Sequence, residues 1–197
     1  VLEIGCGGGQ WSRFMAELGV LRRLYCIDAL SAFHNNFWQF VGEDKRGLVE
    51  YRQVSDFSLA CIPDQSVDYV FSYDVFCHIS LSGQREYLQS LRRKCVTGAQ
   101  LLIMYADPAK YLRSEPENVD FVRSYLPGAD SVSYGSVDEL IGAALADCDG
   151  ASSPGRWYWV GIERFVALAQ EAGYEVVARD LDIDKTNPLT LLRFTTR

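Results

Sequence analysis

The amino-acid sequence predicts an α/β fold, in which a parallel sheet carries helices on both of its faces. Two observations support this prediction. Short apolar segments alternate regularly with segments of helical periodicity through residue 106. Residues 99–105 form a run that is apolar apart from Gln100, which is typical of a strand buried on both faces. Strands that are separated by helices pair in parallel, because the chain crosses over the sheet between one strand and the next.

The predicted elements follow in order along the chain. The first five strands are expected at 1–5, 22–28, 49–54, 67–74 and 99–105, and the helices between them at 10–19, 32–41 and 83–94. An amphipathic helix over 161–172 then stops at Gly173, because glycine is favoured just after a helix end. Two more strands, at 174–179 and 189–194, complete a set of seven.

Residues 107–155 interrupt this alternation. The segment contains four of the six prolines, many turn residues and two weak helices, at 117–126 and 136–146. Ser136 and Glu139 have the spacing of a capping box at the start of the second helix. Long connections at the mouth of a sheet often bind or cover ligands. We therefore predict that 107–155 is an insertion that covers the substrate; a surface excursion without function is the alternative.

Length and charge limit the kind of protein. At 197 residues the chain has the length of one domain, which we expect to span 1–197. Its net charge of −7 disfavours a nucleic-acid partner, which normally leaves a basic face. The basic run Arg92-Arg93-Lys94 ends a predicted helix, where cations complement the helix dipole.

Cysteine usage and hydropathy suggest a location. None of the six cysteines forms a C-x-x-C pair, so we expect small buried side chains in a reducing compartment. The two histidines, His34 and His78, lack a ligand-like spacing to cysteine, so no metal site is expected. No apolar run reaches the ~18 residues of a membrane span, and no signal peptide is visible. We therefore expect a cytoplasmic protein without a membrane partner.

A glycine-rich turn follows the first strand. Glu3 stands on the strand, and Gly5, Gly7 and Gly9 come between it and the first helix. Such a turn brings the backbone close to a ligand, which requires residues that lack a Cβ or accept a positive φ. The dinucleotide fingerprint G-x-G-x-x-G would need its third glycine at position 10, where this sequence has Gln10.

The pattern acid-x-Gly-x-Gly-x-Gly resembles motif I of the class I S-adenosylmethionine (SAM)-dependent methyltransferases. The resemblance covers most of 1–106 and 157–197. It implies a Rossmann-like fold with the seventh strand antiparallel between strands five and six, and SAM as the cofactor. In that family the motif I acid lies near the methionine amino end of SAM, which is the role expected for Glu3. Coulomb attraction to a sulfonium and an ammonium group favours an acid there.

Acidic residues after the next strands extend the resemblance. Asp28 follows the glycine turn at the ~20-residue distance of a ribose-binding acid, and a helix N-cap is its alternative role. A carboxylate there could accept hydrogen bonds from both ribose hydroxyls. Residues 55–79 resemble the family's adenine-binding stretch, which implies adenine binding by Asp56 with the Phe57 backbone beside it. Tyr73 and Asp74, at the carboxyl end of strand four, are also expected to bind the cofactor.

The chain begins inside its first strand. Related enzymes normally have one or more helices before motif I, which often cover the cofactor. The resemblance therefore implies an N-terminally clipped methyltransferase domain.

His78 is the candidate catalytic residue. A hydroxyl acceptor must lose its proton, and histidine suits this work because it titrates near neutral pH. His78 follows strand four, close to where the methyl group should project; capping of the neighbouring turn is its alternative role. Tyr105 and Asp107, at the end of strand five, are further candidates on the acceptor side.

The sequence specifies the acceptor poorly. Many amide and nucleobase N-methyltransferases carry an Asn/Asp-Pro-Pro-aromatic motif after strand four, and residues 74–77 lack it. This favours oxygen or carbon acceptors on small molecules. Residues 157–159 (Trp-Tyr-Trp) could wall an acceptor pocket or pack the last helix onto the sheet.

Three functions follow from these patterns. The first is SAM-dependent transfer of a methyl group to a small-molecule hydroxyl, on a sugar or a secondary metabolite. The alternatives are an NAD(P)-dependent oxidoreductase, against which Gln10 argues, and a non-catalytic binding module of the same fold. The oligomeric state is left open.

Overall fold

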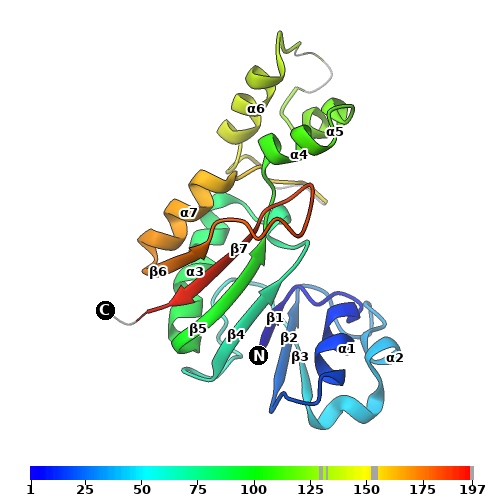
Figure 1. The fold of residues 1–197 in the computed structure, drawn as a ribbon. Coiled ribbons are helices and arrows are strands. Elements are labelled where there is room, and N and C mark those ends of the chain that lie inside the picture. Colours follow the sequence, from blue (N-terminus) through cyan, green and yellow to red (C-terminus); the bar gives the residue numbers. More distant parts are fainter. Residues whose placement is uncertain (129–130, 132, 152–154, 196–197) are drawn as a thin grey trace.

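The computed structural model describes residues 1–128, 131, 133–151 and 155–195. Its seven strands form one sheet in the order β3-β2-β1-β4-β5-β7-β6 (Figure 1). The strands are β1 (Leu2–Ile4), β2 (Leu24–Asp28), β3 (Val49–Gln53), β4 (Val67–Ser72), β5 (Cys95–Met104), β6 (Tyr174–Ala178) and β7 (Leu189–Phe194). Strands β1 to β5 run parallel, whereas β7 is antiparallel to both β5 and β6. The predicted Rossmann-like sheet, with its last strand antiparallel between strands five and six, is confirmed.

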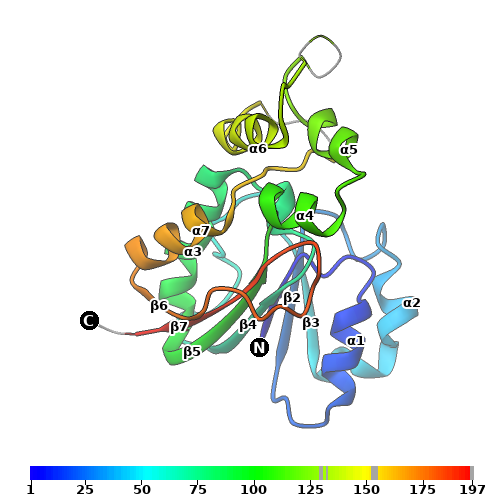
Figure 2. The same ribbon diagram turned by 45° about the horizontal axis from the view of Figure 1, so that its top comes forward.

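Helices cover both faces of the sheet. On one face α1 (Gln10–Glu17) and α2 (Phe37–Val41) lie beside β1, β2 and β3 (Figures 1 and 2). On the other face α3 (Leu81–Lys94) and α7 (Ile162–Glu171) enclose the largest apolar cluster together with β4, β5 and β7. Two short 3-10 helices, η1 (Glu43–Gly47) and η2 (Phe76–His78), precede β3 and α3. Within the described ranges, no helix combines the length and the apolar character that a membrane span requires.

Two local predictions differ from the structure. The helix expected at 32–41 is α-helical only over Phe37–Val41, because Asn36 adopts a left-handed conformation (φ 51°) that ends the preceding turns. A further helix, α4 (Pro108–Ser114), was not expected in the insertion. The Asp107 side chain caps it by accepting a hydrogen bond from Lys110 N at 2.7 Å. Pro108 occupies the first turn, where its missing N–H costs no hydrogen bond.

The insertion forms a small unit beyond the carboxyl end of β5. Its helices α4, α5 (Val119–Ser124) and α6 (Val137–Ala146) stand away from the sheet (Figures 1 and 2). They share an apolar cluster with the buried Trp159 and with Met104 and Leu189 at the end of the sheet. At the start of α6, Ser136 Oγ accepts from Glu139 N at 3.2 Å, while the Glu139 carboxylate accepts from Gly135 N at 2.7 Å. The insertion therefore packs on the end of the sheet through a shared apolar cluster, and its carboxyl-terminal end leads back to the sheet.

Candidate functional site

The glycine-rich turn joins β1 to α1 at the carboxyl edge of the sheet. Gly5 has a φ of +73°, and a Cβ built there would lie 2.0 Å from Val75 Cγ2. Gly7 has a φ of +48°, and a Cβ there would meet nothing within 4 Å. Gly5 thus lets the turn pack against the segment after β4, whereas Gly7 has open space beside it. Gly9 is the N-cap residue of α1 and packs toward Val41 of α2.

Asp28 ends β2 directly beside this turn. Its Oδ2 accepts a hydrogen bond from Gly7 N at 2.9 Å, and its Oδ1 accepts one from Leu30 N at 2.9 Å. These bonds hold the carboxylate against the turn. Each carboxylate oxygen keeps a further lone pair, so Asp28 can still accept hydrogen bonds from a ligand. The alternative role as a helix N-cap does not occur, because turns follow Asp28.

A cleft of about 640 Å³, which we call the main cleft, opens over the edge of β1, β2 and β4. Its lining contains Gly5, Gly7, Asp28, Asp56, Phe57, Asp74 and His78. Apolar side chains from the strand ends, including Ile27, Val54 and Ile79, complete the walls. The topology brings these distant segments together because parallel strands place their carboxyl ends on one edge.

Asp56 and Phe57 form one wall of the main cleft. Asp56 Oδ1 accepts a hydrogen bond from Ser58 N at 2.9 Å. Hydrogen bonds from Ser58 hold the pKa of the exposed Asp56 carboxyl below its usual value. The Phe57 ring packs on Tyr87 of α3 with a centroid distance of 4.8 Å. The wall therefore combines an ionised acceptor with an aromatic face.

A second cleft of about 640 Å³, the aromatic cleft, lies on the other side of the glycine turn. Its lining consists of Cys6, Gly8, Gln10, Trp11, Phe40, Tyr73 and Asp74. The Trp11 and Tyr73 rings lie 5.6 Å apart. The Tyr73 hydroxyl donates to Asp184 Oδ2 at 2.6 Å, and this bond raises the pKa of Tyr73 to about 12. Since Asp74 lines both clefts, they meet at this residue.

Asp74 has an unusual backbone conformation. Its φ of +59° is left-handed, which is uncommon for a residue with a Cβ and is found disproportionately at ligand sites. Asp74 Oδ1 accepts a weak hydrogen bond from Cys77 Sγ at 3.5 Å. Burial and the neighbouring Asp74 raise the pKa of Cys77, so its thiol stays protonated.

Glu3 lies beneath the turn rather than in either cleft. It is buried, and it accepts hydrogen bonds from the Ser12 hydroxyl and, at 3.6 Å, from Cys26 Sγ. Burial raises the pKa of Glu3 to about 7, although these two bonds oppose the change. Its carboxyl joins β1 to α1 directly below the backbone that forms the cleft.

His78 lies in η2, on the wall of the main cleft. Its Nδ1 donates a hydrogen bond to the Arg156 carbonyl oxygen at 2.9 Å. Among the described residues, Nε2 has no hydrogen-bond partner. The backbone N of His78 donates to Val75 O at 2.9 Å, which closes the short turn after β4.

The second-choice candidates on the acceptor side belong to the scaffold. Tyr105 is fully buried, stacks on Phe165 at 4.0 Å and pairs with the Thr190 hydroxyl at 2.9 Å. Asp107 caps α4 and also accepts from Ile162 N at 2.8 Å. Tyr105 therefore has no access to a substrate, and the prediction for it was wrong.

The end of the insertion and the residues after it contribute Gly155 and Arg156, which the sequence analysis missed. Gly155 lines the main cleft, and the Arg156 carbonyl contacts His78. Trp157 packs in an aromatic group with Phe121 at 5.2 Å and stands 6.0 Å from the His78 ring. The Trp-Tyr-Trp run at 157–159 was the only signal in the sequence for this wall. Its contact with His78 could not be predicted, because the whole insertion separates the two in sequence.

Comparison with known proteins assigns the family. The sequence model described as "Methyltransferase domain" matches residues 2–103, which is just over half of the chain. The chain belongs to this methyltransferase family. A search of curated proteins found no relative of similar sequence.

Solved structures support the same fold for this methyltransferase. A SAM-dependent methyltransferase from Aquifex aeolicus matches with a TM-score of 0.63 and 17% identity, covering 98% of this chain and 81% of the other. One from Methanosarcina mazei matches with a TM-score of 0.67 and 14% identity, covering 100% and 92%. The N-methyltransferase NodS from Bradyrhizobium japonicum matches with a TM-score of 0.57 and 12% identity, covering 99% and 85%.

The methyltransferase therefore uses SAM as its methyl donor, and the main cleft fits this cofactor. Asp28 keeps free lone pairs on its carboxylate beside the turn, and the wall with Phe57 is largely apolar. The open space beside Gly7 lets a ligand approach the backbone. An NAD(P)-dependent oxidoreductase is not the function that the family match supports.

Proposed function

We propose that this methyltransferase methylates a hydroxyl group of a small molecule, such as a sugar or a secondary metabolite, in the cytoplasm. The net charge of −7 supports a small acceptor over a nucleic acid. The six free cysteines suit a reducing compartment. When bound, SAM supplies a methyl group on a positively charged sulfur, and the protein must align the acceptor with it and exclude water.

We assign the cofactor residues by their position in the two clefts. Asp28 would accept from the ribose, and Asp56 with the Phe57 backbone would bind the adenine. Gly5, Gly7 and Gly9 shape the turn over which the cofactor would lie, and Glu3 supports that turn from below. Tyr73 and Asp74 stand where the two clefts meet, next to the position expected for the methionine part. The main support is that Asp28, Asp56 and Asp74 line one cleft.

His78 would accept the proton of the acceptor hydroxyl. The observation that carries this role is its place on the cleft wall with one nitrogen bonded to Arg156 O and the other without a partner among the described residues. A positioned histidine of this kind acts as a general base near neutral pH. Asp74, on the same short turn, supplies a negative charge that would stabilise the protonated imidazole.

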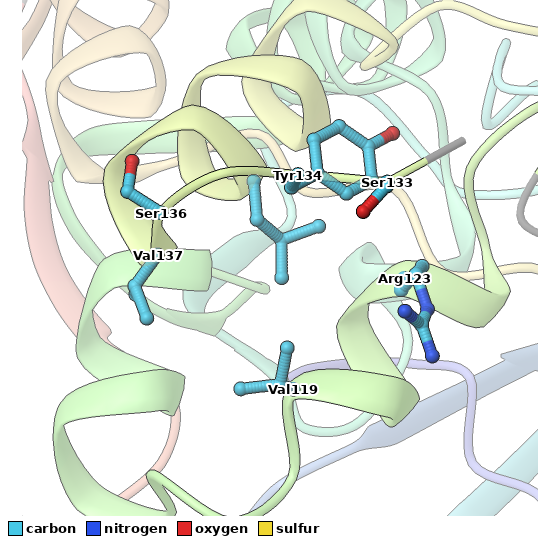
Figure 3. A pocket seen from close by; sticks show the side chains of 7 residues that line it. Val119, Arg123, Ser133, Tyr134, Ser136 and Val137 are labelled. Carbon is cyan, nitrogen blue, oxygen red and sulfur yellow. The ribbon is translucent and has the colours of Figure 1, made fainter.

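The insertion at 107–155 would cover the acceptor. It starts at the end of β5, and its aromatic group reaches His78 through Trp157. The insertion is itself hollowed between α5 and α6, where a cavity of about 260 Å³ is lined by Val119, Arg123, Ser133, Tyr134, Ser136, Val137 and Leu140 (Figure 3). This mixture of apolar and hydroxyl-bearing side chains suits a cover that adapts to a polar acceptor.

Methyl transfer from labelled SAM tests the proposal. The protein is incubated with SAM carrying a labelled methyl group and a metabolite extract, and products that gain the label are identified by mass spectrometry. We expect labelled O-methyl products whose rate of formation falls by on the order of 10²-fold with His78→Ala. Labelling on nitrogen or carbon would contradict the hydroxyl acceptor, and SAM binding without any product would indicate a binding module.

A further inference from the structure

The segment that follows the insertion holds the imidazole of His78 in one tautomer. The Arg156 carbonyl can only accept a hydrogen bond, so His78 Nδ1, at 2.9 Å, must carry the proton. In a neutral imidazole, Nε2 is then the nitrogen that can accept a proton. Two neighbours fix the same contact: Tyr158 N donates to Cys77 O at 2.7 Å, and the Trp157 ring stands perpendicular to the imidazole.

The Arg156 side chain is anchored on several sides. Its guanidinium pairs with the Asp147 carboxylate and donates to Ala151 O at 2.7 Å and Asp147 O at 3.2 Å. It also lies over the Tyr158 ring, 4.8 Å from its centroid. The Arg156 side chain is only 10% exposed and that of Asp147 19%. One ion pair and two hydrogen bonds to backbone carbonyls, with so little solvent around them, hold the residue in one position.

The other partner of this ion pair is fixed to the body of the protein. Directly after Asp147, Cys148 O accepts from Leu81 N at 3.0 Å. The Asp149 carboxylate accepts from Ser82 N at 2.7 Å. Both contacts are with the first turn of α3, which follows His78 by only a few residues. The Asp147–Arg156 ion pair and His78 therefore both lie next to the start of α3.

Gly150 lies in close contact with the Asp147–Arg156 ion pair. A Cβ there would lie 2.2 Å from Asp147 Oδ1 and 2.6 Å from Arg156 Nη2. The φ of Gly150 is not in the left-handed region, so its backbone does not require glycine. A side chain at this position would instead require the Asp147 or the Arg156 side chain to move from its present place.

We propose that Arg156 is a positioning residue for His78. Its ion pair with Asp147 fixes the Arg156 carbonyl, and this carbonyl keeps His78 protonated at Nδ1 with Nε2 free to accept a proton. Arg156 lines neither cleft, so it acts through His78 rather than on the substrates. The inference rests on the proposed role of His78 as the base. It makes that role depend on how the end of the insertion packs beside His78.

Nuclear magnetic resonance of the two histidines tests the proposal. With ¹⁵N-labelled histidine, long-range ¹H–¹⁵N spectra report which ring nitrogen carries the proton, and His34, which is exposed, serves as the internal reference. In the wild type, neutral His78 should be protonated at Nδ1, whereas His34 should show the mixture of a free imidazole. Arg156→Ala and Gly150→Ala should both move His78 toward the spectrum of His34. Gly150→Ala leaves both charged partners in place, so it decides the question if Arg156→Ala fails to fold.

The matched control is Arg123→Ala, which removes an ion pair with Asp120 from the surface of the same insertion. It should leave the His78 spectrum unchanged. A wild-type His78 protonated at Nε2, or a spectrum that neither Arg156→Ala nor Gly150→Ala changes, would overturn the proposal. The measurement needs no acceptor. If the tautomer responds but His78→Ala transfers methyl groups at the wild-type rate, the positioning role stands and the proposed base does not.

Discussion

Replacing Glu3 by glutamine should change how the stability of the protein depends on pH. Glu3 is buried beneath the glycine turn, where burial raises its pKa from 4.5 to about 7. Glutamine has nearly the same shape and can still accept a hydrogen bond from Ser12, but it cannot ionise. The Glu3→Gln variant therefore isolates the free energy of ionising this one carboxyl in the folded protein.

The sign and size follow from proton linkage. A carboxyl whose pKa is raised on folding binds its proton more tightly in the folded protein than in the unfolded chain. The contribution of Glu3 to the free energy of unfolding is thus complete below pH 4.5 and is lost as the pH rises through about 7. The whole change amounts to about 3 kcal/mol. About 2 kcal/mol of it falls between roughly pH 5.5 and roughly pH 8, a range above the pI.

Urea unfolding at several pH values measures this effect. The difference in unfolding free energy between wild type and Glu3→Gln should shift in favour of the variant by about 2 kcal/mol over that range. Glu17→Gln, on the exposed side of α1, is the matched control and should show no such shift. If the unfolding free energies of the wild type and Glu3→Gln changed in parallel with pH, the prediction would be contradicted. Ionising Glu3 would then cost no free energy in the folded protein.

Three further changes test the site. Asp28→Ala should weaken SAM binding by about tenfold to a hundredfold per lost charge-assisted bond in calorimetry, and an unchanged affinity in a folded variant would remove its ribose role. His78→Ala should lower turnover by on the order of 10²-fold with little change in SAM affinity, and equal turnover would show that another group takes the proton. Gly5→Ala should reduce the melting temperature more than Gly7→Ala does, because only the first meets Val75; equal losses would contradict this packing.

Local patterns in the sequence account for much of the fold. The seven strands and the helices α1, α3, α6 and α7 were predicted close to their observed positions, because each has a clear periodicity or a recognisable cap. The helix at 32–41 was predicted too long, since its aromatic spacing does not reveal the left-handed Asn36. The Asp107-Pro108 pair, a favourable N-cap followed by a favourable first residue, could have revealed α4.

The site was predictable where a family motif lies on a strand end. Glu3, Asp28, Asp56 and Asp74 were each expected to bind the cofactor at strand ends; Asp28, Asp56 and Asp74 line one cleft, whereas Glu3 is buried beneath it. Contacts across long sequence separations gave no such signal. The bond from His78 to Arg156 spans the whole insertion, so only the folded chain reveals it. The burial of Glu3 is likewise a consequence of how α1 packs on β1.

A crystal structure of the complex with SAM would show whether the main cleft holds the cofactor. We expect the ribose hydroxyls within hydrogen-bond distance of the Asp28 carboxylate, the adenine beside Asp56 and Phe57, and the sulfonium methyl group directed toward His78. A nucleoside bound outside the main cleft, or an Asp28 carboxylate turned away from the ribose, would contradict this prediction.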